Sequence, residues 1–162
     1  MSKLYDLIIK QVNKEIEHKT KGINEILIAT DYDNHIWLIV DSCAAFRVLN
    51  PWIFDTEKLL AIFHQSGEYR GITNMLKDFE GVPVQYIGTR VEKCEDLHEF
   101  IDKDKPLGTH GYMRKKYFDI LIKLQNENFS PGVLECDFEK CIFKWELYNE
   151  PVAIIWGYKI NK

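Results

Sequence analysis

The sequence predicts an α+β fold, in which helices pack on one face of largely antiparallel sheets. The first observation is a repeated order: residues 2–49 and residues 112–160 each contain a helical pattern followed by three β-type runs. The second is that short polar segments join these runs, which favours hairpins and therefore antiparallel pairing. The third is composition, because 46% of the 162 residues are hydrophobic and 13% are aromatic, enough for the core of one compact domain.

The first half of the chain begins with an amphipathic helix over residues 2–21, which Gly22 ends. Its apolar residues recur at three- and four-residue spacing and comprise Leu4, Tyr5, Ile8, Ile9, Val12 and Ile16. Two β runs follow, over 24–30 and 35–41, and the polar residues between them form a turn. A third extended run covers 46–49.

The middle of the chain is less regular. Asp55 is placed to cap a helix that ends near Gln65, and a further helix is predicted over 69–79. A strand follows over 84–91. For residues 95–111 the spacing of Leu97, Phe100 and Ile101 predicts one helical turn, before a loop that contains glycine and proline.

The last part of the chain repeats the opening order. A helix is predicted over 112–125, with Tyr117, Ile120, Leu121 and Leu124 on one face. Three strands are predicted over 132–138, 141–148 and 152–160. We therefore expect residues 1–162 to form a single domain of two similar halves, about 2–50 and 112–160, joined by a connecting segment, 51–111.

Charge and hydropathy narrow the classes of function. The 21 Lys and Arg residues against 25 Asp and Glu residues give a net charge of −4, which argues against non-specific coating of nucleic acid but permits a local basic stripe. The apolar runs hold no more than five residues, and Asp6 falls within the first turn, so neither a membrane span nor a signal peptide is expected. These features are typical of a soluble, cytoplasmic protein.

Lysines form stripes on the two predicted terminal helices. At about 100° per residue, Lys3, Lys10, Lys14 and Lys21 share a narrow arc opposite the apolar face, and Lys116 and Lys123 lie seven residues apart on the last helix. Such stripes can contact a phosphate backbone without reading sequence. The alternative is a solvated helix face, because Glu17 interrupts the first stripe and Asp119 lies near the second.

No motif identifies a reaction. Cys94 and His98 have the i, i+4 spacing of a nucleophile and its base on a helix, but no third group orients them. His64 and His110 lie near predicted segment ends, where they could flank a cleft. The sequence therefore predicts no catalytic residue and no cofactor, and a small hydrolase or ligand-binding protein with a cleft in residues 64–111 ranks last among the alternatives.

No metal site is predicted either. Asp31, Asp33 and His35 have the alternating spacing that begins a calcium loop, but the glycine and distal glutamate of that pattern are missing, which favours a polar hairpin turn. Cys136 and Cys141 flank a predicted hairpin turn and should lie near each other as two free thiols. A zinc site would need two further ligands that the sequence does not supply.

The tryptophans suggest one surface anchor. Trp37, Trp145 and Trp156 fall in predicted strands, where packing in the core or between strands is expected. Trp52 follows Pro51 in a predicted turn and is the better candidate for contact with a partner protein.

Three stretches give the chain a resemblance to the DNA sliding clamp family, which includes the bacterial β-clamp. Residues 37–48 (WLIVDSCAAFRV) resemble the clamp strand that ends in an aspartate, turns and re-enters the sheet. Residues 116–124 (KYFDILIKL) are similar to a clamp helix, and residues 153–160 (AIIWGYKI) to the closing strand. The chain departs from the family at Ala44 and Ala45, where an arginine is usual, and at Trp156 and Gly157, where Met-Pro is usual.

The resemblance implies a non-enzymatic, clamp-like domain that contacts double-stranded DNA or replication proteins. Lys10, Lys14, Lys116 and Lys123 would then face the hole of a ring, and a chain of this length would have to self-associate to close one. The alternative is a protein-interaction module with no nucleic-acid role, which would bind its partner around Trp52 or along a strand edge.

Overall fold

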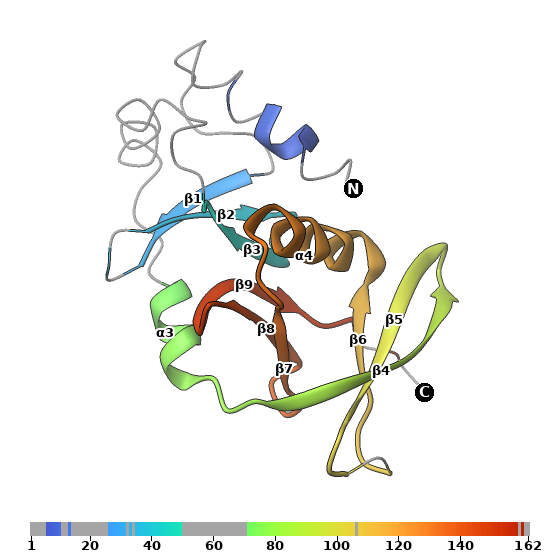
Figure 1. The fold of residues 1–162 in the computed structure, drawn as a ribbon. Helices are drawn as coiled ribbons and strands as arrows, with labels where there is room; N and C mark the ends of the chain where they lie inside the picture. The colour runs from blue at the N-terminus through green and yellow to red at the C-terminus, as the bar shows by residue number, and fades with distance from the viewer. Residues whose placement is uncertain are drawn as a thin grey trace. The chain divides into compact units, whose positions relative to one another are not determined.

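A computed structural model describes residues 6–10, 13, 26–31, 33, 35–49, 71–105, 107–158 and 160. The chain divides into two compact units, one within Lys3–Asp78 and the other within Phe79–Lys162. The division falls inside the segment 51–111 that the sequence suggests is a connector. Each unit is described by itself below, and Figure 1 labels the elements of both.

The first unit contains a three-stranded antiparallel sheet and a helix. Its elements are β1 (Ile26–Thr30), β2 (Ile36–Val40), β3 (Ala44–Arg47) and α3 (Gly71–Asp78). The register pairs Ile26 with Val40 and Val40 with Ala44, so all three strands follow one another as hairpins. This confirms the three predicted β runs and the helix predicted over 69–79, although β3 begins two residues earlier than expected.

Two predicted helices lie partly or wholly outside the described residues. Of the helix expected over 2–21, residues 6–10 and 13 are described, and all of them are helical. The helix expected between Asp55 and Gln65 lies outside the described residues.

Burial in the first unit is concentrated in β2 and β3. All five side chains of β2 are buried, as expected for an apolar run without alternation. In β3, Ala44, Ala45 and Phe46 are buried as well. Trp37 is fully buried, in agreement with the prediction that it packs in the core.

The second unit contains six strands and a helix. Its elements are β4 (Val82–Glu92), β5 (Glu95–Asp102), β6 (Gly111–Arg114), α4 (Lys115–Asn128), β7 (Val133–Asp137), β8 (Ile142–Leu147) and β9 (Glu150–Trp156). Within this unit the strands lie in the order β9-β8-β7-β4-β5-β6, and each neighbouring pair is antiparallel. The long strand β4 connects the β7–β8–β9 part to the β5–β6 part (Figure 1).

The core of the second unit lies between α4 and the sheet. Tyr117, Ile120, Leu121 and Leu124 are all buried on one face of α4, as the sequence predicts. Aromatic rings also connect β5, β8 and α4. The ring centroids of Phe100 in β5 and Phe143 in β8 lie 5.3 Å apart, and those of Phe118 in α4 and Trp145 in β8 lie 6.5 Å apart. Edge-to-face contacts of this kind add about 0.5–1.5 kcal/mol each beyond burial.

The helical turn predicted near residues 97–101 is wrong. These residues form strand β5, in which Leu97 and Phe100 are buried. The cause is the tight turn at Lys93 and Cys94, which have φ values of 47° and 66° and pair β4 directly with β5. Such turns are usually marked by Asn-Gly or Asp-Gly, and neither occurs here.

The start of the last helix also differs from expectation. Residues 111–114 pair with β5 as strand β6, so α4 begins at Lys115 rather than at Tyr112. The three strands that follow α4 agree with those predicted, and the β7–β8 hairpin brings Cys136 and Cys141 to the two sides of one turn. Both are free thiols, and burial raises the pKa of Cys136 well above its usual value.

The chain is therefore an α+β protein with antiparallel strands, as predicted. Within the described ranges, no helix has the length and apolar character needed to cross a lipid bilayer.

Candidate functional site

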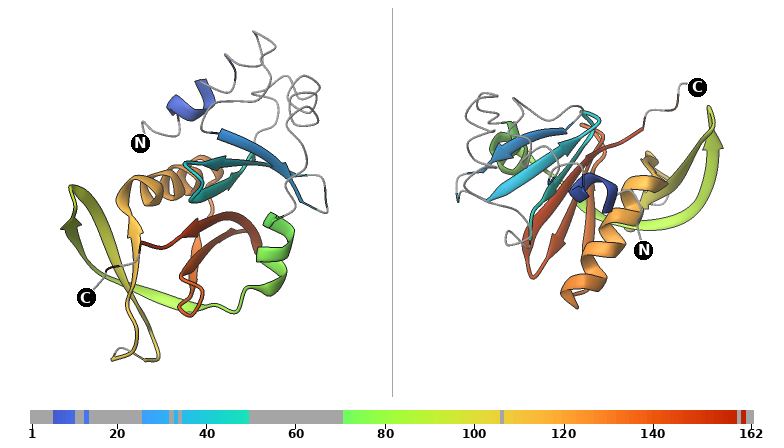
Figure 2. Two further views of the ribbon diagram at one scale, coloured as in Figure 1. Left: turned by 180° about the vertical axis from the view of Figure 1, so that it is seen from behind. Right: turned by 90° about the horizontal axis from the view of Figure 1, so that it is seen from above.

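The most unusual surface of the second unit is the outer edge of β4. At its start, Val82 and Pro83 pair with Cys136 and Glu135 of β7. From Val84 to Glu92 the strand pairs with β5 on one side, and no described strand pairs with its other side. Figure 2 shows the β4–β5 hairpin extending away from β7, β8 and β9 in both views. A row of backbone amide and carbonyl groups is thus left open along this edge.

The side chains of β4 are also exposed. Seven of its eleven residues are classed as exposed, including Tyr86 (50%), Ile87 and Val91 (66%). The two charged side chains neutralise each other, because Nη2 of Arg90 lies 2.6 Å from Oε1 of Glu92. The open edge is therefore long, combines apolar with polar side chains, and carries no net charge.

A β-bulge divides this edge. The pairing of β4 with β5 shifts between Tyr86 and Gly88, so that Ile87 is the extra residue, and Gly88 has φ 156°. Tyr86, Thr89 and Val91 of β4 lie opposite Phe100, His98 and Asp96, which are alternate residues of β5. Because alternate residues of a strand share one face of the sheet, the side chains of Thr89 and Val91, beyond the bulge, lie on the same face as that of Tyr86.

That shared face carries a hydrogen-bonded chain that ends on a buried histidine. The hydroxyl groups of Tyr86 and Thr89 lie 2.5 Å apart, and Oγ1 of Thr89 lies 2.8 Å from Nδ1 of His98. The imidazole ring also makes edge contacts with Tyr86 and Phe118, each with centroids 4.9 Å apart. Only 8% of His98 is exposed.

The surroundings of His98 keep its ring neutral. Burial lowers the pKa of His98, and the positive charge of Lys115 lowers it further, while Asp119 and Asp96 act in the opposite direction. A neutral imidazole can accept one hydrogen bond and donate another, which suits the hydroxyl group of Thr89. His98 therefore links the exposed strand β4 to α4 through a hydrogen bond to Thr89 and an edge contact with Phe118.

The first turn of α4 gathers three consecutive cations. Nε of Arg114 lies 2.6 Å from Oε2 of Glu95, and Nζ of Lys115 lies 3.0 Å from Oδ2 of Asp119. Lys116 is exposed, with Nζ 5.1 Å from the ring centroid of Tyr117. Carboxylates therefore pair with Arg114 and with Lys115. A cavity of ≈ 330 Å³ lies beside this turn and the tip of the β4–β5 hairpin.

Cys94 and His98 do not form a nucleophile–base pair. Cys94 lies in the β4–β5 turn and His98 lies four residues further along β5. At about 3.3 Å per residue, four residues of strand separate their backbones by roughly 13 Å. The i, i+4 proximity expected from a helix is lost because the segment is a strand.

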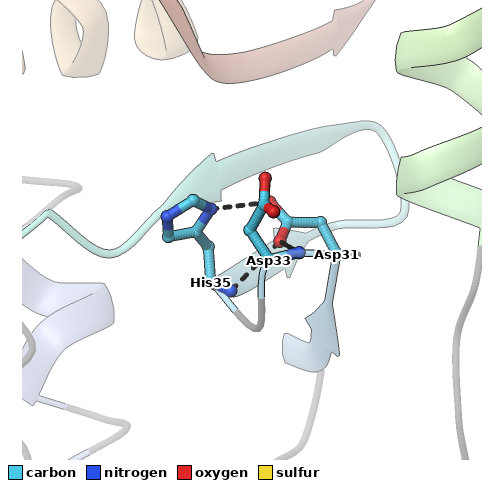
Figure 3. A group of neighbouring side chains, drawn as sticks. All are labelled: Asp31, Asp33 and His35. Carbon is cyan, nitrogen blue, oxygen red and sulfur yellow. Dashed lines mark hydrogen bonds and ion pairs between the residues drawn. The ribbon is translucent and has the colours of Figure 1, made fainter.

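Asp31, Asp33 and His35 meet in the turn between β1 and β2 (Figure 3). Oδ1 of Asp31 accepts hydrogen bonds from the backbone N–H groups of Asp33 (2.9 Å) and His35 (3.0 Å). Its Oδ2 lies 3.1 Å from Nδ1 of His35 and accepts a bond of 2.9 Å from Nε1 of Trp37. This is the polar hairpin turn that the sequence favours over a calcium loop.

The hydrogen bonds of Asp31 also determine its charge state. Burial raises the pKa of this carboxyl group, but the bonds donated by Trp37 and His35 outweigh that effect and hold the pKa below its usual value. One ligand atom from each of Asp31, Asp33 and His35 lies within 4.8 Å of the others. A cation bound here would have to displace the donors that already occupy both oxygens of Asp31.

The lysine stripes are only partly described. Lys10 is exposed in the first unit and Lys116 in the second, whereas Lys3, Lys14 and Lys21 lie outside the described residues. Lys123 is 6% exposed, with Nζ 3.7 Å from Oε1 of Glu127, so it does not extend an exposed stripe from Lys116. The proposed anchor Trp52 and His64 also lie outside the described residues. Of the predicted binding residues that the structure describes, Lys10 therefore lies in the first unit, and Lys116 and Lys123 lie on α4 of the second.

Sequence reasoning missed the open edge as a specific site. The strand itself is visible in residues 84–91, and its mixture of Gln85, Thr89 and Arg90 with apolar residues is a signal of exposure on both faces. The sequence could not predict that residues 84–92 have a described strand on one side only, because strand order depends on pairing between distant segments.

Comparison with protein-family models, with curated proteins and with solved structures gives no significant match.

Proposed function

We propose that the protein is a non-enzymatic interaction module that binds an extended segment of a partner protein along the open edge of β4. The observation that carries this proposal is that residues 84–92 have a strand neighbour on one side only among the described residues, while their side chains are mostly exposed. Addition of a strand to such an edge supplies backbone hydrogen bonds, and alternate side chains supply specificity.

The start of the same edge indicates the orientation of the partner. β7 already pairs with it at Val82 and Pro83, in antiparallel register. An antiparallel partner segment would occupy the edge beyond the point where β7 leaves it. The partner's side chains on one face would then contact Tyr86, Thr89 and Val91.

Charge and bulge define the chemistry of the segment. Arg90 is paired with Glu92, so the edge offers no unbalanced charge and favours an apolar, uncharged segment. The bulge at Ile87 interrupts regular pairing. A partner segment that pairs with β4 over three or four residues before or after the bulge therefore fits the edge better than one long straight strand.

The test is selection of short peptides from a displayed random library against the intact protein, followed by binding measurements with the enriched peptides. Val91→Lys places a charge on the edge and should weaken binding by about tenfold or more. The matched control is Val133→Lys, the same change at a position on β7 that is 52% exposed, and it should leave affinity unchanged. If no peptide is enriched, or if both variants bind equally well, the proposal is wrong.

Contact with the DNA backbone is a second candidate. It is favoured by the exposed side chain of Lys116 in the cationic first turn of α4, and by the order in which α4 precedes three antiparallel strands. This is the order that gave the resemblance to sliding clamps. The first candidate is better supported because Lys123 is buried and Glu95 and Asp119 pair with the cations beside Lys116.

The DNA candidate is tested by fluorescence anisotropy with a short duplex at several salt concentrations. Lys116→Glu should weaken binding and reduce the salt slope by about 1. Lys105→Glu, at another exposed position of the same unit, is the control. A clamp would also have to self-associate, so a strictly monomeric mass by light scattering would exclude a ring built from this chain alone.

A further inference from the structure

A cleft of ≈ 650 Å³ lies in the second unit, and the residues that line it follow β4 and β5 in the chain. Its walls come from the β5–β6 connection, from β6, from the β7–β8 turn and from the segment after β9, and its lining includes Leu107, His110, Tyr112, Phe138, Cys141 and Tyr158. This volume falls within the range of about 300–1,000 Å³ that is typical of small-molecule sites.

Backbone hydrogen bonds hold one wall of the cleft in place. The N–H of Gly157 donates to the carbonyl of Cys141 (2.7 Å), and the N–H of Tyr158 donates to the carbonyl of Tyr112 (2.8 Å). A Cβ atom at Gly157 would lie 2.6 Å from Sγ of Cys141 and 3.2 Å from the Tyr112 carbonyl oxygen. Only glycine permits this close approach, so the wall has a fixed position.

His110 presents one nitrogen that the protein leaves available. Its Nδ1 is hydrogen-bonded to Oε2 of Glu99. Because a carboxylate only accepts hydrogen bonds, Nδ1 carries the proton in this pairing, and in the neutral imidazole Nε2 is then an acceptor. No described residue forms a hydrogen bond with Nε2.

Glu99 also lies beside a second polar group of the cleft. It lies opposite Tyr112 in the β5–β6 register, and the guanidinium carbon of Arg90 lies 5.8 Å from the centroid of the Tyr112 ring. Burial raises the pKa of Tyr112, and the negative charge of Glu99 raises it further, so the phenol keeps its proton. The carboxylate of Glu99 thus orients the His110 ring before any ligand arrives, and it lies beside Tyr112 in the sheet.

The rest of the lining combines the apolar or aromatic side chains of Leu107, Phe138, Tyr158 and Ile160 with the polar side chains of Thr109 and Glu139. Leu107 is fully exposed at the cleft, and the guanidinium group of Arg114 lies 5.0 Å from the centroid of the Tyr158 ring. An exposed leucine beside aromatic rings favours a ligand with a flat, apolar body.

We propose that this cleft binds a small, uncharged aromatic ligand whose hydroxyl or N–H group donates a hydrogen bond to Nε2 of His110. The aromatic body would lie against Leu107 and Tyr158. Simple phenols are the smallest molecules with this chemistry. The site is independent of the strand edge, so either proposal can fail without the other.

The experiment compares 4-methylphenol with 4-methylanisole, which has the same ring but no donor. Binding to the intact protein is followed by amide and imidazole ¹⁵N shifts in NMR titrations. 4-Methylphenol should bind about two- to tenfold more tightly and should move the Nε2 resonance of His110. The shifted amides should include those of residues 107–112 and 158.

Variants separate the role of His110 from general packing. In His110→Phe the preference for the phenol should disappear, and in Glu99→Gln it should shrink, because the imidazole loses its orientation. His35→Phe is the matched control, the same change in the first unit, and it should keep the preference. The proposal is overturned if neither compound shifts the cleft residues up to its solubility limit, if the two bind equally, or if His110→Phe retains the preference.

Discussion

β9 and β4 belong to the same unit, yet their side chains have opposite surroundings. In β9 the four side chains from Val152 to Ile155 are all buried, whereas seven of the eleven residues of β4 are exposed. Residues 152–156 of β9 form an unbroken apolar run, whereas β4 mixes apolar, polar and charged residues. The difference teaches that packing determines the sequence of β9, while much of β4 contributes little to the core and is available for contact with another molecule.

The largest expected effect on the free energy of unfolding comes from a change in the buried strand β9. Ile154→Ala removes a side chain that is 2% exposed and should lower the free energy of unfolding by about 2–5 kcal/mol. Val91→Ala, at a position that is 66% exposed in β4, should change it by no more than about 0.5 kcal/mol. Urea denaturation of the two variants measures both values. Equal losses would mean that β4 is packed in solution.

The turn at Asp31 should contribute the next largest effect. Asp31→Asn replaces an oxygen that accepts hydrogen bonds by an N–H donor, so some of the groups now bonded to the carboxylate lose their acceptor. We expect a loss of about 1–3 kcal/mol in the free energy of unfolding, measured by urea denaturation at neutral pH. A loss as small as that of Val91→Ala would contradict the assigned bonds.

Asp31 also predicts a pH dependence. Its folded pKa is below 3.8, so the unfolded state binds the proton first as the pH falls. The stabilisation is present above pH 3.8 and is lost as the pH falls from there through the folded pKa. Asp31→Asn should therefore show a weaker decline in stability over that range than the original protein does.

His98, in β5, predicts a second range of pH over which the free energy of unfolding changes. Its folded pKa lies below 6.5, so protonation of the unfolded state lowers the free energy of unfolding as the pH falls from 6.5 towards the folded pKa. His98→Gln should flatten the pH profile in this window and leave the window of Asp31 unchanged. An unchanged profile would mean that His98 titrates freely in the folded protein.

The smallest expected effect is a gain in stability. Lys93 and Cys94 have φ values of 47° and 66° in the β4–β5 turn, a conformation that Asn and Gly adopt at lower cost. The double variant Lys93→Asn, Cys94→Gly should raise the free energy of unfolding by about 0.5–1 kcal/mol, measured by urea denaturation. A loss of stability would show that the two original side chains make contacts worth more than the strain.

The sequence predicts those parts of the fold that carry a strong periodic signal. The apolar face of α4, the buried run of β2 and the three strands after α4 are all found as expected, because each pattern is long enough to identify its element. β5 was mistaken for a helical turn, because Leu97, Phe100 and Ile101 fit helical spacing and the preceding turn has neither Asn nor Gly.

The candidate site was far less predictable than the fold. Its features arise where segments distant in sequence meet: the edge of β4 is open because β7 leaves it after Pro83, and the cleft forms where residues 107–112 and 158 lie together. Two hypotheses from the sequence concern these features: that His110 flanks a cleft agrees with its place in the lining, and that a strand edge binds a partner stays a prediction. Neither pattern specifies its neighbours, so spacing alone could not have located either site.

β5 and β7, the two strands that pair with β4, lie at very different distances from it along the chain. This difference predicts the order in which the two pairs form. β5 follows β4 across a two-residue turn, whereas Val82 pairs with Cys136, 54 positions further along the chain. A local hairpin closes in about 1–10 μs, while a pair so distant in sequence must wait for a long loop to close. The β4–β5 hairpin can therefore form before β7 is in place, so the folding chain displays this edge early, and a partner present during synthesis could meet it before the rest of the unit is complete.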